Sequence, residues 1–144
     1  MRKVVVLFLV LSVLFSCDKA PGKLVDTSNI ELSVHVDRFE QKYYATDAQT
    51  LPELKQVYPY LFPVQTPDSI WLQKIQDKDE RYLLRKVDSV FPSLEEETLE
   101  IEQLFKNITY YYPNFKAPKV ISLITKVDYE SKVIYADSLL LFSI

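Results

Sequence analysis

The chain has 144 residues, of which 48% are hydrophobic and 13% aromatic, enough apolar material for one folded domain. Its formal net charge is −3 with acidic and basic residues interspersed, which argues against the cationic surface that nucleic-acid binding needs. With Gly22 as the only glycine and Cys17 as the only cysteine, the sequence excludes glycine-rich phosphate loops, an intrachain disulfide and a two-thiolate zinc site. We therefore expect no cofactor.

A basic and then strongly apolar segment opens the chain. Arg2 and Lys3 precede residues 4–15, in which Ser12 is the only polar residue. A helix of this length rises about 18 Å, well short of the roughly 30 Å hydrocarbon core that a membrane-spanning helix must cross. The sequence therefore predicts a cleaved signal peptide over residues 1–16 rather than a permanent transmembrane anchor.

The end of this segment reads Leu14-Phe15-Ser16-Cys17. It resembles the lipobox of bacterial lipoproteins, with leucine at −3, a small residue at −1 and cysteine at +1, although Phe15 at −2 is bulkier than usual. The resemblance implies cleavage between Ser16 and Cys17 and attachment of two or three acyl chains, such as palmitate, at Cys17. At ~0.8 kcal/mol per buried methylene, two or more chains hold a protein firmly in a lipid bilayer. An ordinary signal peptide followed by a free thiol is the alternative.

A polar stretch and then a period-two pattern follow. Residues 17–29 include the pair Pro21-Gly22 and show no sustained periodicity, so we expect a lipidated N-terminus and tether. Hydrophobic residues then alternate with polar ones over 30–37, which predicts a half-buried strand. His35 falls on its polar face, and we interpret it as an exposed strand histidine rather than a metal ligand or catalytic base, since no partners lie near it in the sequence.

Prolines divide the next part of the chain. Residues 51–58 predict a short helix that Pro52 opens and Pro59 closes. The aromatic, proline-rich stretch 58–67 is expected to be rigid and extended, as a structural plug or, alternatively, as the wall of a peptide-binding groove. Asp68 or Ser69 is expected to cap the helix that follows.

Two further helices are predicted on either side of Pro92. After a break at 77–79, residues 81–91 show apolar positions at helical spacing. The strongest helical pattern begins at Ser93 and reaches Tyr112, with Glu95, Glu96 and Glu97 in its first turn, where the helix dipole favours anions. We interpret these glutamates as helix N-terminal residues and not as a catalytic pair or a calcium site, because consecutive side chains spread around a helix instead of converging.

The last third of the chain is rich in apolar residues. A nearly continuous apolar run within 118–127 predicts a strand that is buried on both faces. A short strand or turn is expected at 133–136 and another apolar segment at 139–144. The predicted fold class is therefore α+β over residues 30–144, with an N-terminal strand, several helices and then apolar strands. Because folded proteins rarely end within an apolar run, we expect an N-terminal fragment of a longer protein, whose domain is incomplete.

Three blocks carry a family resemblance: Arg38-Phe39, YPYLFP at 58–63 and VIYADSL at 133–139. Over residues 30–144 the chain resembles the GldB family of gliding-motility lipoproteins of the Bacteroidetes, whose members continue beyond the position of Ile144. The resemblance implies a lipoprotein anchored in the cell membrane, with its domain in the periplasm of the cell envelope. It also implies a requirement in gliding, with other gliding or type IX secretion proteins as partners.

Two interpretations of function remain open. In the first, the chain is a non-enzymatic component that binds other envelope proteins, and confinement by the anchor raises the local concentration of weakly binding partners. In the second, it is part of a metallopeptidase-like enzyme, or of a degenerate enzyme, whose active-site half lies beyond residue 144. This chain has one histidine and no HExxH motif, so we assign no catalytic residue and no metal ligand within it. Two histidines four residues apart on a later helix would favour the enzyme.

Overall fold

The computed structural model describes residues 25–125 and 132–144, and every structural statement below concerns these residues. The predicted signal peptide, the expected cleavage site at Ser16, the expected lipid-attachment residue Cys17 and most of the expected tether lie outside them. The elements follow one another as β1 (Val36–Arg38), α2 (Phe39–Ala45), α3 (Leu51–Val57), a 3-10 turn (Pro59–Leu61), α4 (Asp68–Gln76), α5 (Lys78–Val90), α6 (Glu95–Tyr111), β2 (Lys119–Leu123), β3 (Val133–Ala136) and β4 (Leu139–Ser143).

The strands form one mixed sheet in the order β1-β2-β4-β3. Strands β1, β2 and β4 run parallel, while β3 is antiparallel to β4. Val36 lies opposite Val120, and Val120 lies opposite Leu140. The predicted α+β class, with an N-terminal strand, helices and then C-terminal strands, is confirmed.

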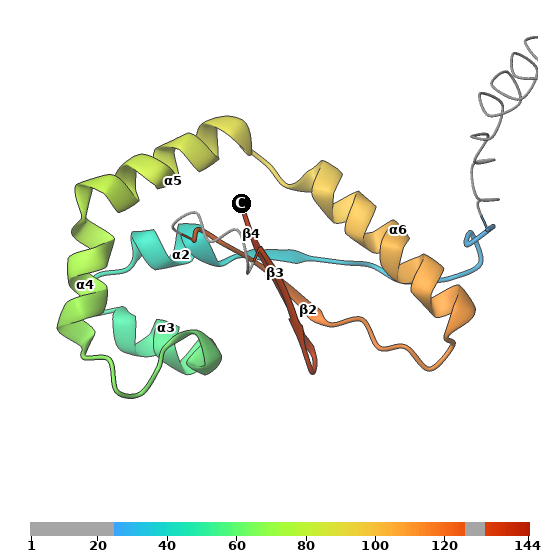
Figure 1. Ribbon diagram of the computed structural model, residues 1–144, viewed down its shortest axis with the longest axis horizontal. Coiled ribbons are helices and arrows are strands. Elements are labelled where there is room, and N and C mark those ends of the chain that lie inside the picture. The colour runs from blue at the N-terminus through green and yellow to red at the C-terminus, as the bar shows by residue number, and fades with distance from the viewer. Residues whose placement is uncertain (1–24, 126–131) are drawn as a thin grey trace, which may run out of the picture.

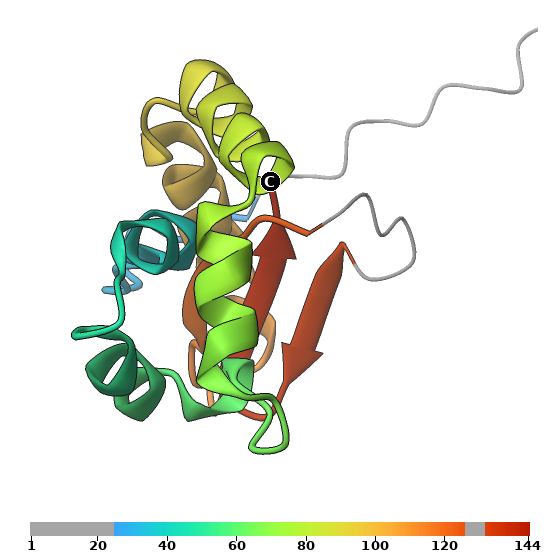
Figure 2. The same cartoon turned by 90° about the vertical axis from the view of Figure 1, so that its left-hand side faces the viewer.

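Helices cover both faces of the sheet around β2 (Figures 1 and 2). Helices α2 to α5 lie on one side, where Ile121 joins the larger core cluster, and α6 lies on the other, where Val120 packs with Phe105. Val120, Ile121 and Ser122 of β2 are at most 1% exposed. The prediction of a strand buried on both faces is therefore confirmed.

Aromatic rings dominate the larger core cluster. Phe39 of α2 packs edge-on against Tyr58, with ring centroids 5.0 Å apart, and Phe62 meets Trp71 at the same distance. Tyr58 and Phe62 of the proline-rich stretch are buried in this cluster, as a structural plug requires, and Leu61 and Phe62 also line a pocket with Tyr43 and Trp71. The stretch is not extended as predicted, however, because Pro59 begins a 3-10 turn that the Phe62 amide closes by donating to the Pro59 carbonyl.

The first predicted strand is mostly unpaired. Exposure alternates along residues 30–36 as the period-two pattern predicts, but only Val36–Arg38 pair with β2. The preceding residues pack against α6 instead, where the Val34 amide donates to the Glu102 carboxylate at 3.3 Å, and Leu32 contacts the smaller core cluster. Apolar alternation reports which side chains are buried and does not report whether a neighbouring strand is present.

Several helix boundaries differ from the sequence prediction. Helix α2 was not predicted. The expected cap at Asp68 or Ser69 is wrong, because Pro67 is the N-cap residue of α4 and makes no side-chain cap bond. Helix α5 begins at Lys78, earlier than expected, because Asp77 caps it, and α6 begins at Glu95 rather than at Ser93. Within the described ranges, no helix is both long enough and apolar enough to cross a bilayer.

Candidate functional site

The junction between β1 and α2 brings together most of the buried charges of the described chain. It reads Val36-Asp37-Arg38-Phe39-Glu40, and Asp37 and Glu40 are only 7% and 1% exposed. Burial of a carboxylate is unfavourable unless it is paired and hydrogen-bonded. The partners of these two groups therefore define the site.

Asp37 is the centre of a cluster of two lysines and a tyrosine. The Lys42 ammonium lies 2.5 Å from Oδ1, and the Tyr58 hydroxyl donates to Oδ2 at 2.6 Å. Lys119, the first residue of β2, places its ammonium 3.2 Å from Oδ2 and 4.5 Å from the centroid of the Tyr58 ring. Parallel pairing of β1 and β2 is what brings Lys119 to Asp37 from more than eighty positions away.

These contacts shift the protonation equilibria of the cluster. Burial favours the neutral form of Asp37, but hydrogen bonds from Lys42, Tyr58 and Lys119 outweigh it, so the pKa of the carboxyl is lowered. The hydrogen bond to Asp37 raises the pKa of Lys42. Burial and the same carboxylate raise the pKa of the Tyr58 hydroxyl. The cluster therefore holds one anion and two cations at neutral pH.

The two lysines also face solvent, since the Lys42 and Lys119 side chains are 51% and 44% exposed. Each ammonium has three donor hydrogens, and the carboxylate balances only one of the two positive charges. The cluster is thus chemically suited to contact an anionic group at the surface, while Asp37 itself has its oxygens occupied by donors.

Glu40 is paired separately. Its Oε1 accepts from Arg38 Nε at 2.7 Å, and its Oε2 accepts from the Ser122 hydroxyl at 2.7 Å. Arg38 also donates from Nη1 to the Phe91 carbonyl at 3.0 Å, and its Nη2 lies 3.6 Å from Asp88 Oδ1. These bonds fasten β1 and β2 to the connection between α5 and α6, and their role is structural.

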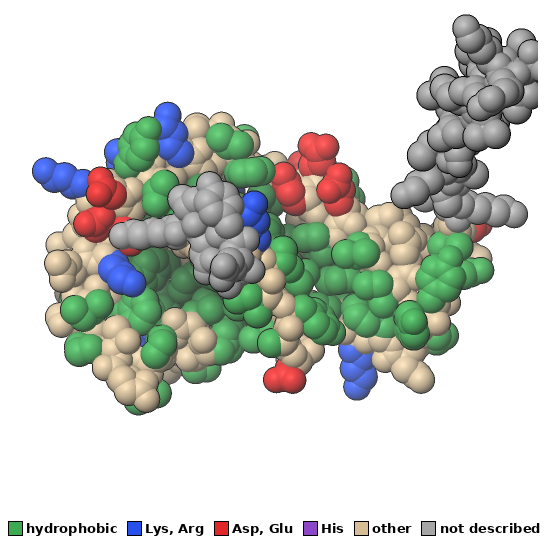
Figure 3. All heavy atoms as spheres, in the orientation of Figure 1, with side chains coloured by type: hydrophobic (Ala, Val, Ile, Leu, Met, Phe, Trp, Pro, Cys, Tyr) green, Lys and Arg blue, Asp and Glu red, His purple; other side chains and the backbone are tan. Residues whose placement is uncertain are grey.

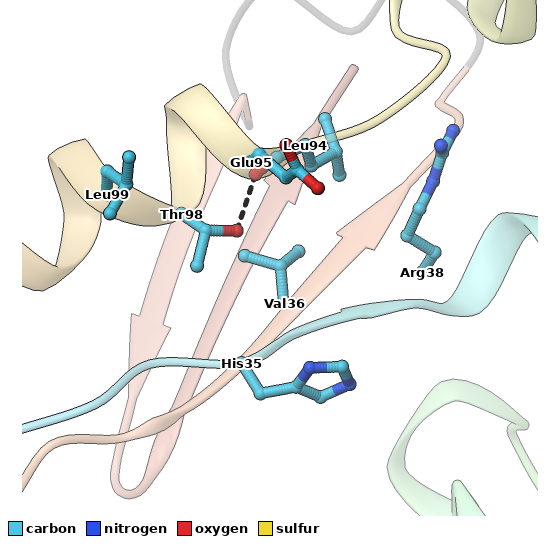
Figure 4. A pocket seen from close by; sticks show the side chains of 7 residues that line it. All are labelled: His35, Val36, Arg38, Leu94, Glu95, Thr98 and Leu99. Atoms are coloured by element: carbon cyan, nitrogen blue, oxygen red, sulfur yellow. Dashed lines mark hydrogen bonds between the residues drawn. The ribbon is translucent and has the colours of Figure 1, made fainter.

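Arg38 also borders a groove between β1 and the start of α6, with a volume of about 480 Å³ (Figure 4). In Figure 4 the Val36 side chain points toward α6, whereas the His35 ring points away from it. Leu94 is buried and Leu99 is 66% exposed. The groove thus has an apolar wall with Glu95 at one margin, which suits an apolar side chain that is flanked by a cation. Its lining consists of His35, Val36, Arg38, Leu94, Glu95, Thr98 and Leu99.

The residues considered as candidate functional residues in the sequence do not come together in one site. His35 is exposed, as predicted, and lies at the groove. Glu95, Glu96 and Glu97 occupy the first turn of α6, as predicted. In the parts of the chain that the structure describes, no three His, Cys, Asp or Glu residues are grouped so that they could hold a metal ion. Ser16 and Cys17 are outside these parts.

Sequence reasoning missed the clusters around Asp37 and Glu40. One signal was available: two acids lie on either side of Arg38 where an apolar strand pattern stops. Ser122 is likewise the one polar residue in the buried core of β2. Neither signal identifies Lys42 or Lys119 as a partner, because the fold alone brings these lysines to Asp37.

Fold and site together define an α+β domain with a mixed sheet, a charged strand–helix junction and an apolar surface groove. The chain belongs to the family of the gliding motility protein GldB, whose family model matches residues 22–144. The family resemblance noted in the sequence is therefore confirmed. Neither the curated proteins nor the solved structures contain a match.

Proposed function

We propose that this gliding-motility protein is a lipoprotein held in the cell membrane by acylated Cys17, with its α+β domain in the periplasm. In this proposal residues 1–16 are removed as the signal peptide, residues 17–29 are the lipidated tether, and the domain acts by binding other gliding or secretion proteins. The observation that carries the proposal is the family match, which begins at residue 22, shortly after the Leu14-Phe15-Ser16-Cys17 sequence.

The surface of α6 supports a binding role. Acidic side chains gather over the start of this helix, and hydrophobic side chains lie over the rest of it and beside it (Figure 3). Leu99, Leu104 and Tyr111 are 66%, 51% and 63% exposed. Apolar surface of this kind beside a groove is typical of protein interaction sites. The acidic margin favours a partner segment that carries an apolar residue next to lysine or arginine.

Replacing the proposed lipid-attachment residue tests the anchor. Cys17→Ser removes the sulfur to which acyl chains would be attached, so we expect the variant to leave the membrane fraction and to fail to restore gliding in a strain that lacks the protein. Ser16→Ala, which keeps a small residue before the cysteine, is the matched control and should behave as wild type. Fractionation with immunoblotting measures the first effect, and colony spreading measures the second.

Mass spectrometry of the purified protein tests directly whether Cys17 is acylated. The proposal predicts an N-terminal peptide that begins at Cys17 and carries acyl chains. A processed chain with an unmodified thiol, or a Cys17→Ser variant that stays with membranes as wild type does, would show that the anchor is wrong. Normal gliding by a variant that has left the membrane would show that anchoring is not required.

A further inference from the structure

Strand β3 forms an open edge of the sheet. It is the last strand in the order β1-β2-β4-β3, so one of its edges pairs with β4 and the other with no described strand. All of β3 is exposed, with Val133, Ile134 and Tyr135 at 64%, 44% and 59%. An exposed apolar edge strand is a template for pairing with another chain.

The opposite edge of the sheet is different. Strand β1 has only three residues, and the chain before it is held against α6 by the bond from the Val34 amide to Glu102. Short edge strands and covered edges are the usual protection against unwanted pairing. Among the described strands, β3 therefore offers the more accessible edge.

The register with β4 shows which backbone groups of β3 face outward. The Ser143 amide donates to the Lys132 carbonyl at 2.8 Å, and Ile134 lies opposite Leu141. Residues in an antiparallel pair alternate between those that bond to the partner strand and those that do not. Lys132 and Ile134 thus direct their backbone groups toward β4, while Val133 and Tyr135 direct theirs to the open edge.

We propose that β3 pairs antiparallel with β3 of a second copy of this chain, with the two-fold axis at Ile134. Val133 then lies opposite Tyr135 of the second copy, and the outward amides and carbonyls of these residues bond to each other. The same operation places Tyr135 opposite Val133 of the second copy. An aromatic residue opposite a β-branched one is a favourable cross-strand pair.

The extent of the strand favours this register. With the axis at Ile134, the pairs made by Val133, Ile134 and Tyr135 all lie within β3. The two-fold axis repeats each pair, as a self-complementary interface requires. The neighbouring register, with Tyr135 on the axis, would set Val133 opposite Asp137, whose φ of 51° has already left the extended conformation.

Cysteine cross-linking tests both the dimer and its register. The experiment uses the mature protein from residue 17 onward, carrying Cys17→Ser so that no native cysteine of this sequence remains. Ile134→Cys would place two cysteines directly opposite each other at a non-hydrogen-bonded pair, where Cα atoms about 4.5 Å apart suit a disulfide. Under mild oxidation we expect a covalent dimer to form at least about tenfold faster than with Val57→Cys, a control on α3 whose side chain is more exposed, at 54% against 44% for Ile134.

A second variant breaks the pairing without removing the cysteine. Val133→Pro deletes an outward N–H that β4 does not use, at the first residue of an edge strand, where proline is tolerated. Added to Ile134→Cys, it should reduce cross-linking to the rate of the control while circular dichroism and the melting temperature stay near those of the parent chain.

The outcomes are decisive in either direction. Cross-linking of Ile134→Cys no faster than that of Val57→Cys would overturn the proposal and leave the edge of β3 to a strand of another protein. Faster cross-linking of Tyr135→Cys than of Ile134→Cys would overturn the register. Because the experiment uses an unanchored chain, its failure would not bear on the lipid anchor proposed above.

Discussion

Asp37 shows how a single buried carboxylate can organise a surface. Its two carboxylate oxygens contact the polar groups of Lys42, Tyr58 and Lys119. Residues from β1, α2, the end of α3 and β2 therefore meet at this carboxylate. Hydrogen bonds to a charged group contribute more to stability than neutral ones. Removing the carboxylate would take an acceptor from Lys42, Tyr58 and Lys119, although Lys42 keeps its bond to the Tyr58 hydroxyl. The cluster is therefore expected to stabilise the fold as well as to present positive charge.

Replacing this carboxylate should cost stability in a way that depends on pH. The folded pKa of Asp37 is lowered, so its contribution to stability is present above the unfolded pKa and is lost as the pH falls through the folded pKa. The unfolded value is about 3.9. We expect Asp37→Asn to lower the free energy of unfolding by about 1–3 kcal/mol at pH 7, and the difference from wild type to shrink below about pH 4.

Urea denaturation of both proteins at pH 7, 4 and 3 measures this effect. The control is Asp68→Asn, because Asp68 is half exposed and pairs with Lys55 at the surface. Such pairs are worth about 0–1 kcal/mol. A loss that is as large for Asp68→Asn as for Asp37→Asn would contradict the role given to the Asp37 cluster.

At the scale of elements, a side-chain cap explains where α5 begins, whereas α4 begins without one. Asp77 ends α4 and starts α5, and its Oδ1 accepts from the amides of Asp79 and Glu80, both at 3.0 Å. These are two of the amides that the first turn of a helix leaves without a partner. Helix α4 begins after Pro67 without such a bond, although Asp68 and Ser69 are residue types that often cap helices.

The difference between the two helix starts predicts different costs of substitution. Asp77→Ala should lower the free energy of unfolding by about 0.5–2 kcal/mol, because it removes both cap bonds. Ser69→Ala should change it by less than about 0.5 kcal/mol, as surface substitutions usually do. Thermal or urea unfolding of the two variants provides the measurement. Equal losses would mean that the Asp77 cap does not stabilise α5.

At the scale of the molecule, the domain combines an apolar groove, an open sheet edge and a proposed anchor. The groove lies beside β1, and β3 is at the other end of the sheet, so the two surfaces are separate. A pair of copies joined through β3 would keep both grooves accessible. In the proposed arrangement the anchors hold both copies at one membrane, where weak contacts gain from a high local concentration.

The groove itself can be tested in cells. Leu99→Lys replaces an exposed apolar wall residue by a cation, so it should repel the cationic segment expected there while leaving the core intact. We expect reduced colony spreading with unchanged membrane fractionation. Val64→Lys, at a loop residue that is 94% exposed, is the control and should spread normally. Normal spreading by Leu99→Lys would remove the groove as the binding surface.

Local sequence signals were enough for much of the fold. Proline positions predicted the limits of α3, helical apolar spacing predicted most of α5 and α6, and the uninterrupted apolar run predicted the central strand β2. Each of these signals depends on residues a few positions apart, which side-chain periodicity and backbone sterics link directly. The family could also be recognised from sequence blocks, and the family match bears this out.

Only the tertiary structure shows which strands pair and which side chains contact the buried charges. Residues 30–35 carry a strand pattern, yet none of the described strands pairs with them, and Leu32 and Val34 pack on α6 instead. Lys119 reaches Asp37, and Ser122 reaches Glu40, only because β2 lies parallel to β1. Such contacts join residues about eighty positions apart, and no periodic pattern encodes a partner at that distance. Periodicity determines which side chains are buried, whereas the packing of elements decides which buried charges meet.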